Sequence, residues 1–132
     1  MSADADADGV RVIRSADAIR VAMLSGEGEA VALVWPGMGA RHRSMHRIRL
    51  PAGATSLVMR HDSDSVYFVV EGKADFVDLT LGESVSCDEG SAVHIDSGTE
   101  YQIRAETEPA LLVGGACPPD PRLYQDSSTA AG

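Results

Sequence analysis

The chain has 132 residues, a formal net charge of −9 and a hydrophobic fraction of 44%, which is ordinary for a globular protein. This length predicts one domain with one core, and the negative charge disfavours binding to nucleic acid or to an anionic membrane surface. No stretch approaches the roughly 20 apolar residues that span a bilayer, and residues 1–9 lack the basic and apolar parts of a signal peptide. We therefore expect a cytoplasmic protein.

Both ends of the chain are rich in small and polar residues. Residues 1–8 read MSADADAD and offer nothing to bury, so we expect them to be disordered. We place a single domain at residues 9–121 and a flexible C-terminal tail at residues 122–132. Within that tail, Leu123 and Tyr124 are apolar enough to lie against the domain.

Between the ends, short alternating or apolar runs are separated by Gly, Pro and Asp turn signals, which predicts β-strands throughout. About ten short strands with a turn signal every 8 to 12 residues are typical of an all-β sandwich or barrel. Residues 15–24 come closest to a helical period. The expected strands cover residues 10–14, 18–23, 30–35, 41–50, 55–61, 66–70, 74–79, 83–87, 92–95, 100–105 and 110–114.

Residues 41–50 alternate in a way that fixes which face is inside. Successive side chains of a strand point to opposite faces, and here one face carries four arginines. Four guanidinium groups cannot line an apolar interior without partners. The opposite face, with His42, Ser44 and His46, should therefore point into the core.

Two segments resemble the motifs of the cupin superfamily. Residues 53–72 match the glycine spacing of the first motif, G-x5-HxH-x3,4-E-x6-G, and residues 90–105 match that of the second, G-x5-PxG-x2-H-x3-N. The anchors are Gly53 and Gly72, then Gly90 and Gly98. Over residues 30–121 the resemblance implies an all-β double-stranded β-helix, or jelly-roll barrel, that forms a homodimer and holds a small molecule inside the barrel.

The chemistry of the cupin motifs is mostly missing. In the superfamily, three histidines and a glutamate bind a divalent transition metal, but the matching positions here offer one imidazole beside a thioether, a hydroxyl and a phenol. We therefore expect no metal and no cofactor. The alternative is a divalent transition metal in a rearranged site built from His42, His46 and His61. The four matching residues are Met59, His61, Ser65 and Tyr101.

The strands on either side of the turn at residues 51–54 start from one point, so His42, His46 and His61 are expected to share one cavity. The first two could instead be hydrogen-bonded core histidines, or could contact a ligand without metal. His94 lies between two apolar residues and should face outward. The residues expected to line the ligand pocket are His42, Ser44, Met59, Ser65, Tyr67 and Ile103.

Three functions fit these residues. The first is a metal-independent biosynthetic enzyme of the isomerase, cyclase, epimerase or dehydratase type, with His61 as base, Tyr101 as acid or oxyanion donor, and His46 as a third catalytic group. The second is a non-catalytic small-molecule-binding or sensor protein. The third is a metal-dependent lyase or dioxygenase. We favour the first, with a small-molecule substrate.

Overall fold

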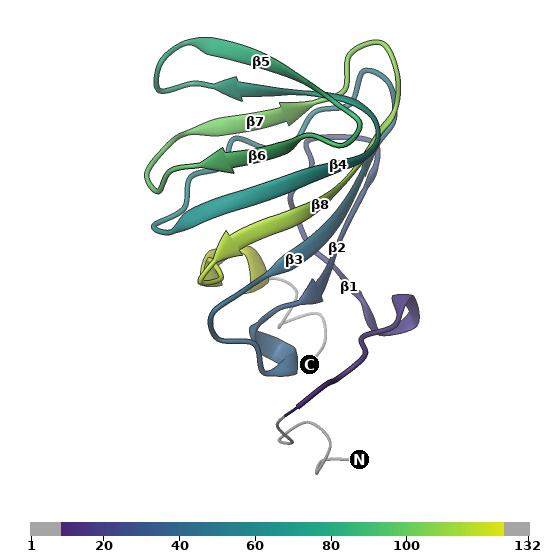
Figure 1. Cartoon of the computed structure of the whole chain (residues 1–132), viewed down its shortest axis with the longest axis vertical. Coiled ribbons are helices and arrows are strands. Elements are labelled where there is room, and N and C mark those ends of the chain that lie inside the picture. The colour runs from purple at the N-terminus through teal and green to yellow at the C-terminus, as the bar shows by residue number, and fades with distance from the viewer. Residues whose placement is uncertain (1–8, 126–132) are drawn as a thin grey trace.

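The computed structural model describes residues 9–125, so residues 1–8 and 126–132, including the predicted disordered N-terminus, lie outside it. The all-β prediction is confirmed. None of the helices in the described part of the chain is long and apolar enough to cross a membrane. In chain order (Figure 1) the elements are η1 (Ser15–Asp17), β1 (Ile19–Arg20), β2 (Glu29–Val34), η2 (Pro36–Met38), β3 (Met45–Leu50), β4 (Asp64–Asp78), β5 (Glu83–Asp88), β6 (Ala92–Ile95), β7 (Tyr101–Arg104), β8 (Ala110–Cys117) and η3 (Pro121–Tyr124).

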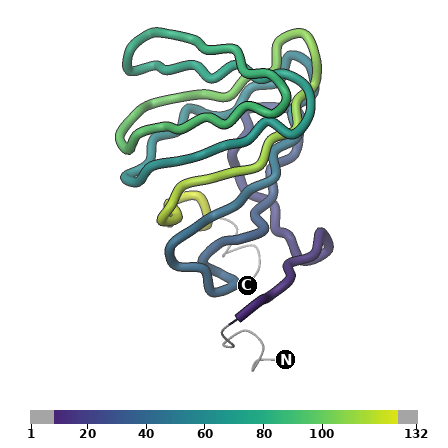
Figure 2. The backbone as a smooth tube through the Cα atoms, in the orientation of Figure 1, coloured from purple at the N-terminus to yellow at the C-terminus, as the bar shows by residue number. Residues whose placement is uncertain are grey.

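Strand β4 belongs to two antiparallel sheets and joins them. Its first half pairs with β8 and β6, which extends the order β1-β2-β3-β8-β4, and its second half pairs with β5 and β7. Isolated bridges from Thr55 to Arg104 and from Met59 to Tyr101 extend the second sheet. Figure 2 shows the chain doubling back between these layers, as expected for a jelly roll.

A bulge lets β4 change sheets. The register of β4 against β8 shifts between Val69 and Glu71, and Gly72 follows with a φ of +79°. A Cβ on Gly72 would overlap the carbonyl group of Pro109, so both the backbone conformation and the space require glycine. The sequence predicted a turn at residues 71–73 that separates two strands. The structure instead has one strand, bent at this point.

The alternation argument for residues 41–50 holds only within the strand. His46, Ile48 and Leu50 are fully buried, as predicted. Strand β3, however, begins at Met45, and residues 41–44 precede it without strand pairing. The prediction that His42 faces the interior is wrong: its side chain is exposed, because a two-residue period has no meaning outside a strand.

The domain also extends further than predicted at its C-terminal side. Residues 122–124 belong to η3 rather than to a flexible tail. Tyr124 is buried, and its ring lies 5.4 Å from the ring of Trp35. The suggestion that this part of the tail lies against the barrel is confirmed, and η3 covers one end of the interior.

Candidate active site

A chain of four hydrogen-bonded side chains crosses the buried interior of the barrel. His61 Nδ1 lies 2.7 Å from Asp120 Oδ2, and His61 Nε2 lies 2.7 Å from the Tyr101 hydroxyl oxygen. The Tyr101 hydroxyl is also 2.7 Å from that of Tyr67. Each of these four side chains is almost completely buried. We refer to Asp120, His61, Tyr101 and Tyr67 as the relay.

Backbone pairing holds the two central members of the relay together. Tyr101 is the first residue of β7, and its N–H and C=O pair with those of Met59, at 2.9 and 2.8 Å. His61 follows two residues later, and its carbonyl accepts a hydrogen bond of 2.8 Å from the N–H of Gly98. Both side chains therefore project from a fixed backbone frame, which restricts their rotamers.

Charge and hydrogen bonding determine the positions of the protons. Burial opposes ionisation of Asp120, but hydrogen bonds from Arg122 and His61 outweigh it and lower the pKa of the carboxyl group. The carboxylate can only accept, so His61 Nδ1 donates to it. In a neutral imidazole, Nε2 then accepts from the Tyr101 hydroxyl, whose oxygen accepts from Tyr67. Burial raises the pKa of Tyr101 to about 12, so this phenol is protonated at neutral pH.

The carboxylate at the end of the relay was not predicted from the sequence. Asp120 is the N-cap of η3: its Oδ1 accepts from the Arg122 N–H, and the Arg122 guanidinium contacts both of its oxygens at 3.1 Å. The guanidinium also donates to the Arg60 carbonyl at 2.7 Å. The available signal was Asp before Pro, which is typical of a helix N-terminus.

His46 belongs to a second hydrogen-bonded group in the barrel. Its Nδ1 lies 3.2 Å from the carbonyl of Gly114 and must donate to it, so Nε2 accepts from the Tyr124 hydroxyl at 2.8 Å. Burial lowers the pKa of His46 to about 4, which leaves the imidazole neutral at pH 7. Ser44 lies next to it and donates to the carbonyl of Ala116. Both ring nitrogens of His46 are thus engaged by β8 and η3.

The residues at the cupin metal position come together but do not fit a divalent metal. Met59, His61, Ser65 and Tyr101 are all buried. Both ring nitrogens of His61 are engaged within the relay, and the Tyr101 phenol resists ionisation. The remaining donors are a neutral hydroxyl and a thioether, which are poor ligands for such an ion. Ser65 Oγ has no hydrogen-bond partner of standard geometry, although it is near enough to Tyr101 to act on the pKa of its hydroxyl.

One of the three histidines of the rearranged metal site lies apart from the other two. His46 and His61 are buried in the same barrel, but His42 is exposed before β3 begins. These three imidazoles therefore do not line one cavity. The predicted pocket residues Ser44, Met59, Ser65, Tyr67 and Ile103 are all buried in the barrel, and His94 is exposed as predicted.

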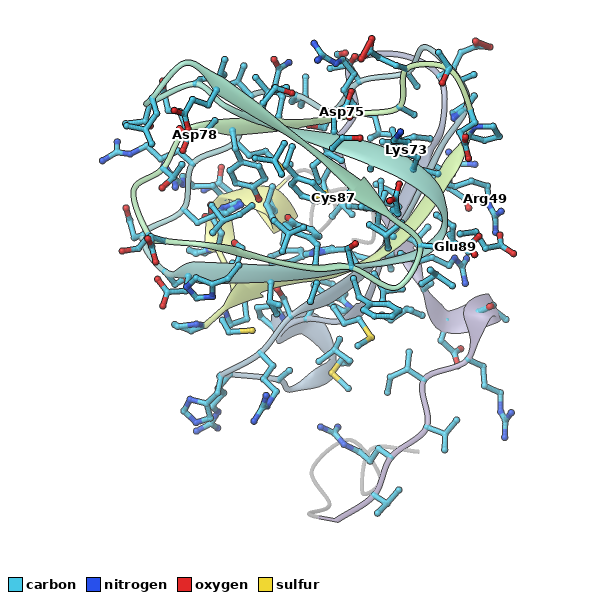
Figure 3. All side chains as sticks on the ribbon, turned by 45° about the horizontal axis from the view of Figure 1, so that its top comes forward. Arg49, Lys73, Asp75, Asp78, Cys87 and Glu89 are labelled. Atoms are coloured by element: carbon cyan, nitrogen blue, oxygen red, sulfur yellow. The ribbon has the colours of Figure 1, made fainter. Side chains whose placement is uncertain are left out.

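One central member of the relay, Tyr101, lines a cavity in the mouth of the barrel. This cavity has a volume of about 350 Å³, lies between β4, β5 and β6, and is lined at one side by Tyr101. We refer to it as the mouth cavity. Figure 3 looks into this end of the barrel, with Cys87 in the interior and Asp78 at the rim. The volume is in the range of small-molecule sites.

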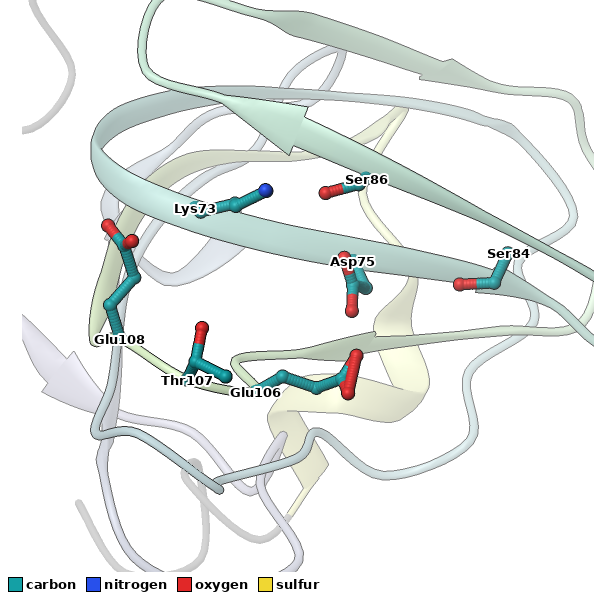
Figure 4. Close-up of a pocket in the computed structure, with 7 residues that line it drawn as sticks. All are labelled: Lys73, Asp75, Ser84, Ser86, Glu106, Thr107 and Glu108. Carbon is teal, nitrogen blue, oxygen red and sulfur yellow. The ribbon is translucent and has the colours of Figure 1, made fainter.

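Two further cavities lie outside the mouth. One, of about 290 Å³, adjoins the other end of the relay at His61, Asp120 and Arg122. The other, of about 320 Å³, lies on the outer face of the second sheet (Figure 4), where Lys73 and two serines face three carboxylates. Both the mouth cavity and the cavity at His61 combine apolar side chains with the relay, but only the mouth cavity is lined by Tyr101.

Comparison with solved structures supports this architecture. The polyketide cyclase RemF from Streptomyces resistomycificus superposes with a TM-score of 0.67 at 16% identity, covering 86% of this chain and 82% of that one. An RmlC-like cupin from Shewanella frigidimarina gives 0.63 at 17%, covering 83% and 92%. The chain has the cupin fold. A predicted oxalate decarboxylase from Thermotoga maritima gives 0.63 at 23%, covering 79% of this cupin chain and 96% of its own.

These similarities extend to the fold alone. No protein-family model and no curated protein sequence matches this chain. Cupin neighbours with different names share one architecture, so the fold does not select among their activities. The assignment of a function to this chain therefore depends on the relay and the mouth cavity.

Proposed function

We propose that this cupin is a metal-independent enzyme that moves a proton on a small molecule bound in the mouth cavity. Isomerisation, cyclisation, epimerisation and dehydration share such a step. The observation that carries the proposal is the hydrogen bond of 2.7 Å from Tyr101 to His61, which is itself hydrogen-bonded to the Asp120 carboxylate. A polyketide cyclase among the structural neighbours is consistent with this reaction class.

The relay gives Tyr101 a way to act as a base despite its raised pKa. As the phenol oxygen takes a proton from a carbon atom of the substrate, its own proton passes to His61 Nε2. The imidazolium that forms keeps its Nδ1–H on the Asp120 carboxylate, so the new positive charge is paired. The substrate becomes an enolate, and Tyr67 remains a donor to the Tyr101 oxygen. Return of the proton to another atom completes an isomerisation.

The proposal is tested with 2-tetralone, an apolar bicyclic ketone with acidic protons beside its carbonyl group. Proton NMR in D₂O measures the exchange of these protons for deuterium. We expect the wild-type protein to accelerate the exchange, and Tyr101→Phe and His61→Gln to lower the rate about 10²- to 10⁴-fold. Lys73→Gln, in the outer polar cavity, is the control and should match the wild type.

Three outcomes would contradict the proposal. Equal exchange rates for the wild type and for folded Tyr101→Phe would exclude the relay as the catalytic group. Activity that disappears after dialysis against EDTA and returns with a divalent metal would support the metal-dependent alternative. Binding of 2-tetralone without any exchange would indicate a non-catalytic small-molecule-binding protein.

We also propose that the protein is a homodimer that associates through the outer face of the first sheet. Val66, Phe68 and Met45 on this face are 46%, 44% and 42% exposed, which is unusual for large apolar side chains on one flat surface. Across the sheet, Leu111 pairs with Arg49 on one side and with Glu71 on the other. A twofold axis along β8 would therefore place each arginine over the glutamate of the second copy.

A further inference from the structure

The charges around the mouth cavity indicate which molecules it can take. The rim carries the carboxylates of Asp78 and Asp96, and the described residues that line the cavity include neither lysine nor arginine. The lining also includes His94, but its Nε2 lies 3.1 Å from Asp96 Oδ1, so this imidazole is already engaged by a rim carboxylate. An anionic ligand would therefore approach two like charges without a lysine or an arginine to pair with, which is unfavourable in a partly dehydrated site.

The wall of the cavity is apolar. Phe76 and Ile95 are buried, and Val93 packs against the same core. Val85 lies two residues before the buried Cys87 on β5, so both side chains point to the cavity side, and Val85 is 58% exposed because this end of the barrel is open. An uncovered apolar wall of this kind favours an apolar ligand.

Two further carboxylates lie near the wall of the cavity, beside Cys87. Burial raises the pKa of the Cys87 thiol, and the carboxylates of Asp75 and Asp88 raise it further. Neither carboxylate lines the cavity, yet both act on a side chain that does. The carboxylates near this wall, one on β4 and one at the end of β5, therefore add negative charge on the same side as the rim.

We propose that the substrate is an uncharged apolar molecule, of about the size of two fused rings, and that anionic molecules are excluded from the mouth cavity. This inference rests on the proposed function, because it places the substrate where Tyr101 can reach it. It separates this cupin from enzymes whose substrates carry phosphate or carboxylate groups, since such a group would have to be held at a rim of carboxylates.

The experiment compares three probes with the same rings and different charges, which are 1-naphthol, 1-naphthoate and 1-naphthylmethylamine. Isothermal titration calorimetry at pH 8 measures the affinity of each. We expect 1-naphthol to bind and 1-naphthoate to bind at least about tenfold more weakly. The amine should bind no more weakly than the naphthol. Naphthoate that binds as tightly as naphthol, or naphthol that does not bind, would overturn the inference.

Two double variants test whether the rim carboxylates cause the weaker binding of 1-naphthoate. Asp78→Asn/Asp96→Asn removes the rim charges and should bring naphthoate to within about threefold of naphthol. Glu106→Gln/Glu108→Gln makes the same change in net charge at the outer polar cavity (Figure 4) and should leave the ratio unchanged. Equal effects of the two double variants would show that net charge alone determines the preference, and would overturn the inference.

A third variant shows where the probe binds. Val85→Phe adds volume at the open end of the mouth cavity and should weaken 1-naphthol about tenfold, whereas unchanged affinity would overturn the inference. The proposed function can fail separately. If the naphthalene series behaves as expected but 2-tetralone does not exchange its protons, the cavity takes uncharged apolar molecules without the proposed chemistry.

Discussion

His46 and His61 occupy the same barrel in different electrostatic surroundings. His61 donates to a carboxylate, whereas His46 donates to a backbone carbonyl and accepts from a phenol. A charged His46 would lose its acceptor role toward Tyr124, and no carboxylate contacts its ring in the described chain to pair the charge. His61 also disfavours a charged His46 by repulsion.

This difference predicts a loss of stability in acid. The pKa of His46 falls from 6.5 to about 4 on folding, chiefly through burial, so the unfolded chain binds the extra proton more readily. Stability is therefore complete above pH 6.5 and decreases as the pH falls toward 4, by roughly 3 kcal/mol. Urea unfolding at pH 7.5 and at pH 4.5 measures the decrease.

The matched variants are His46→Gln and His94→Gln. His46→Gln keeps an acceptor for Tyr124 but has no proton to bind, so the unfolding free energy should change less between the two pH values. His94→Gln is the same change at an exposed site and should leave the pH dependence as in the wild type. An unaltered pH dependence in His46→Gln would show that another group is responsible.

At the scale of elements, strand β8 has a glycine at the point where it packs against His46. A Cβ on Gly115 would overlap Ser44 Oγ and would lie 2.8 Å from His46 Nδ1. Gly115→Ala should therefore destabilise the protein by about 1–3 kcal/mol, because β3 or β8 must move. Gly26→Ala is the control, since nothing lies within 4 Å of its added Cβ.

Thermal and urea unfolding would measure both glycine variants. Gly26→Ala should lie within about 0.5 kcal/mol of the wild type. Equal stability of Gly115→Ala would mean that β8 does not pack closely on His46, and the position of that imidazole would then be in doubt.

The strands were predictable where alternation and turn residues agree, and less so elsewhere. Residues 92–95 were predicted with their observed bounds, and the inward side chains of β3 followed from the two-residue period. The prediction failed for His42 because a strand end cannot be read from alternation alone. It failed at Gly72 because a bulge and a turn use the same residues.

The candidate site was predictable only in part. His61, Tyr101 and Tyr67 were placed in one interior from motif spacing and strand parity, and the structure joins them by hydrogen bonds. Asp120 follows the last strand on a single helical turn, where no periodic pattern relates it to residue 61. Such a contact depends on tertiary packing: the Asp-Pro pair indicates a helix N-terminus, but it does not show which side chain the carboxylate contacts.

At the scale of the whole molecule, the proposed dimer predicts a change in mass on one substitution. Sedimentation equilibrium should give twice the mass of the chain for the wild type and a monomer for Phe68→Glu, because two carboxylates would be buried at the twofold interface. Leu81→Glu is the control: Leu81 is 70% exposed in the turn after β4, away from that face. A monomeric wild type would contradict the proposal.

The relay is tested most directly by nitrogen-15 NMR of the histidine rings, which shows which ring nitrogen carries a proton. The relay predicts a protonated Nδ1 for His61 near neutral pH, with its proton resonance shifted downfield by the Asp120 carboxylate. Asp120→Asn should move that resonance upfield, whereas Asp96→Asn, the same change at the rim, should not. An unprotonated His61 Nδ1, or a resonance that Asp120→Asn leaves in place, would contradict the relay.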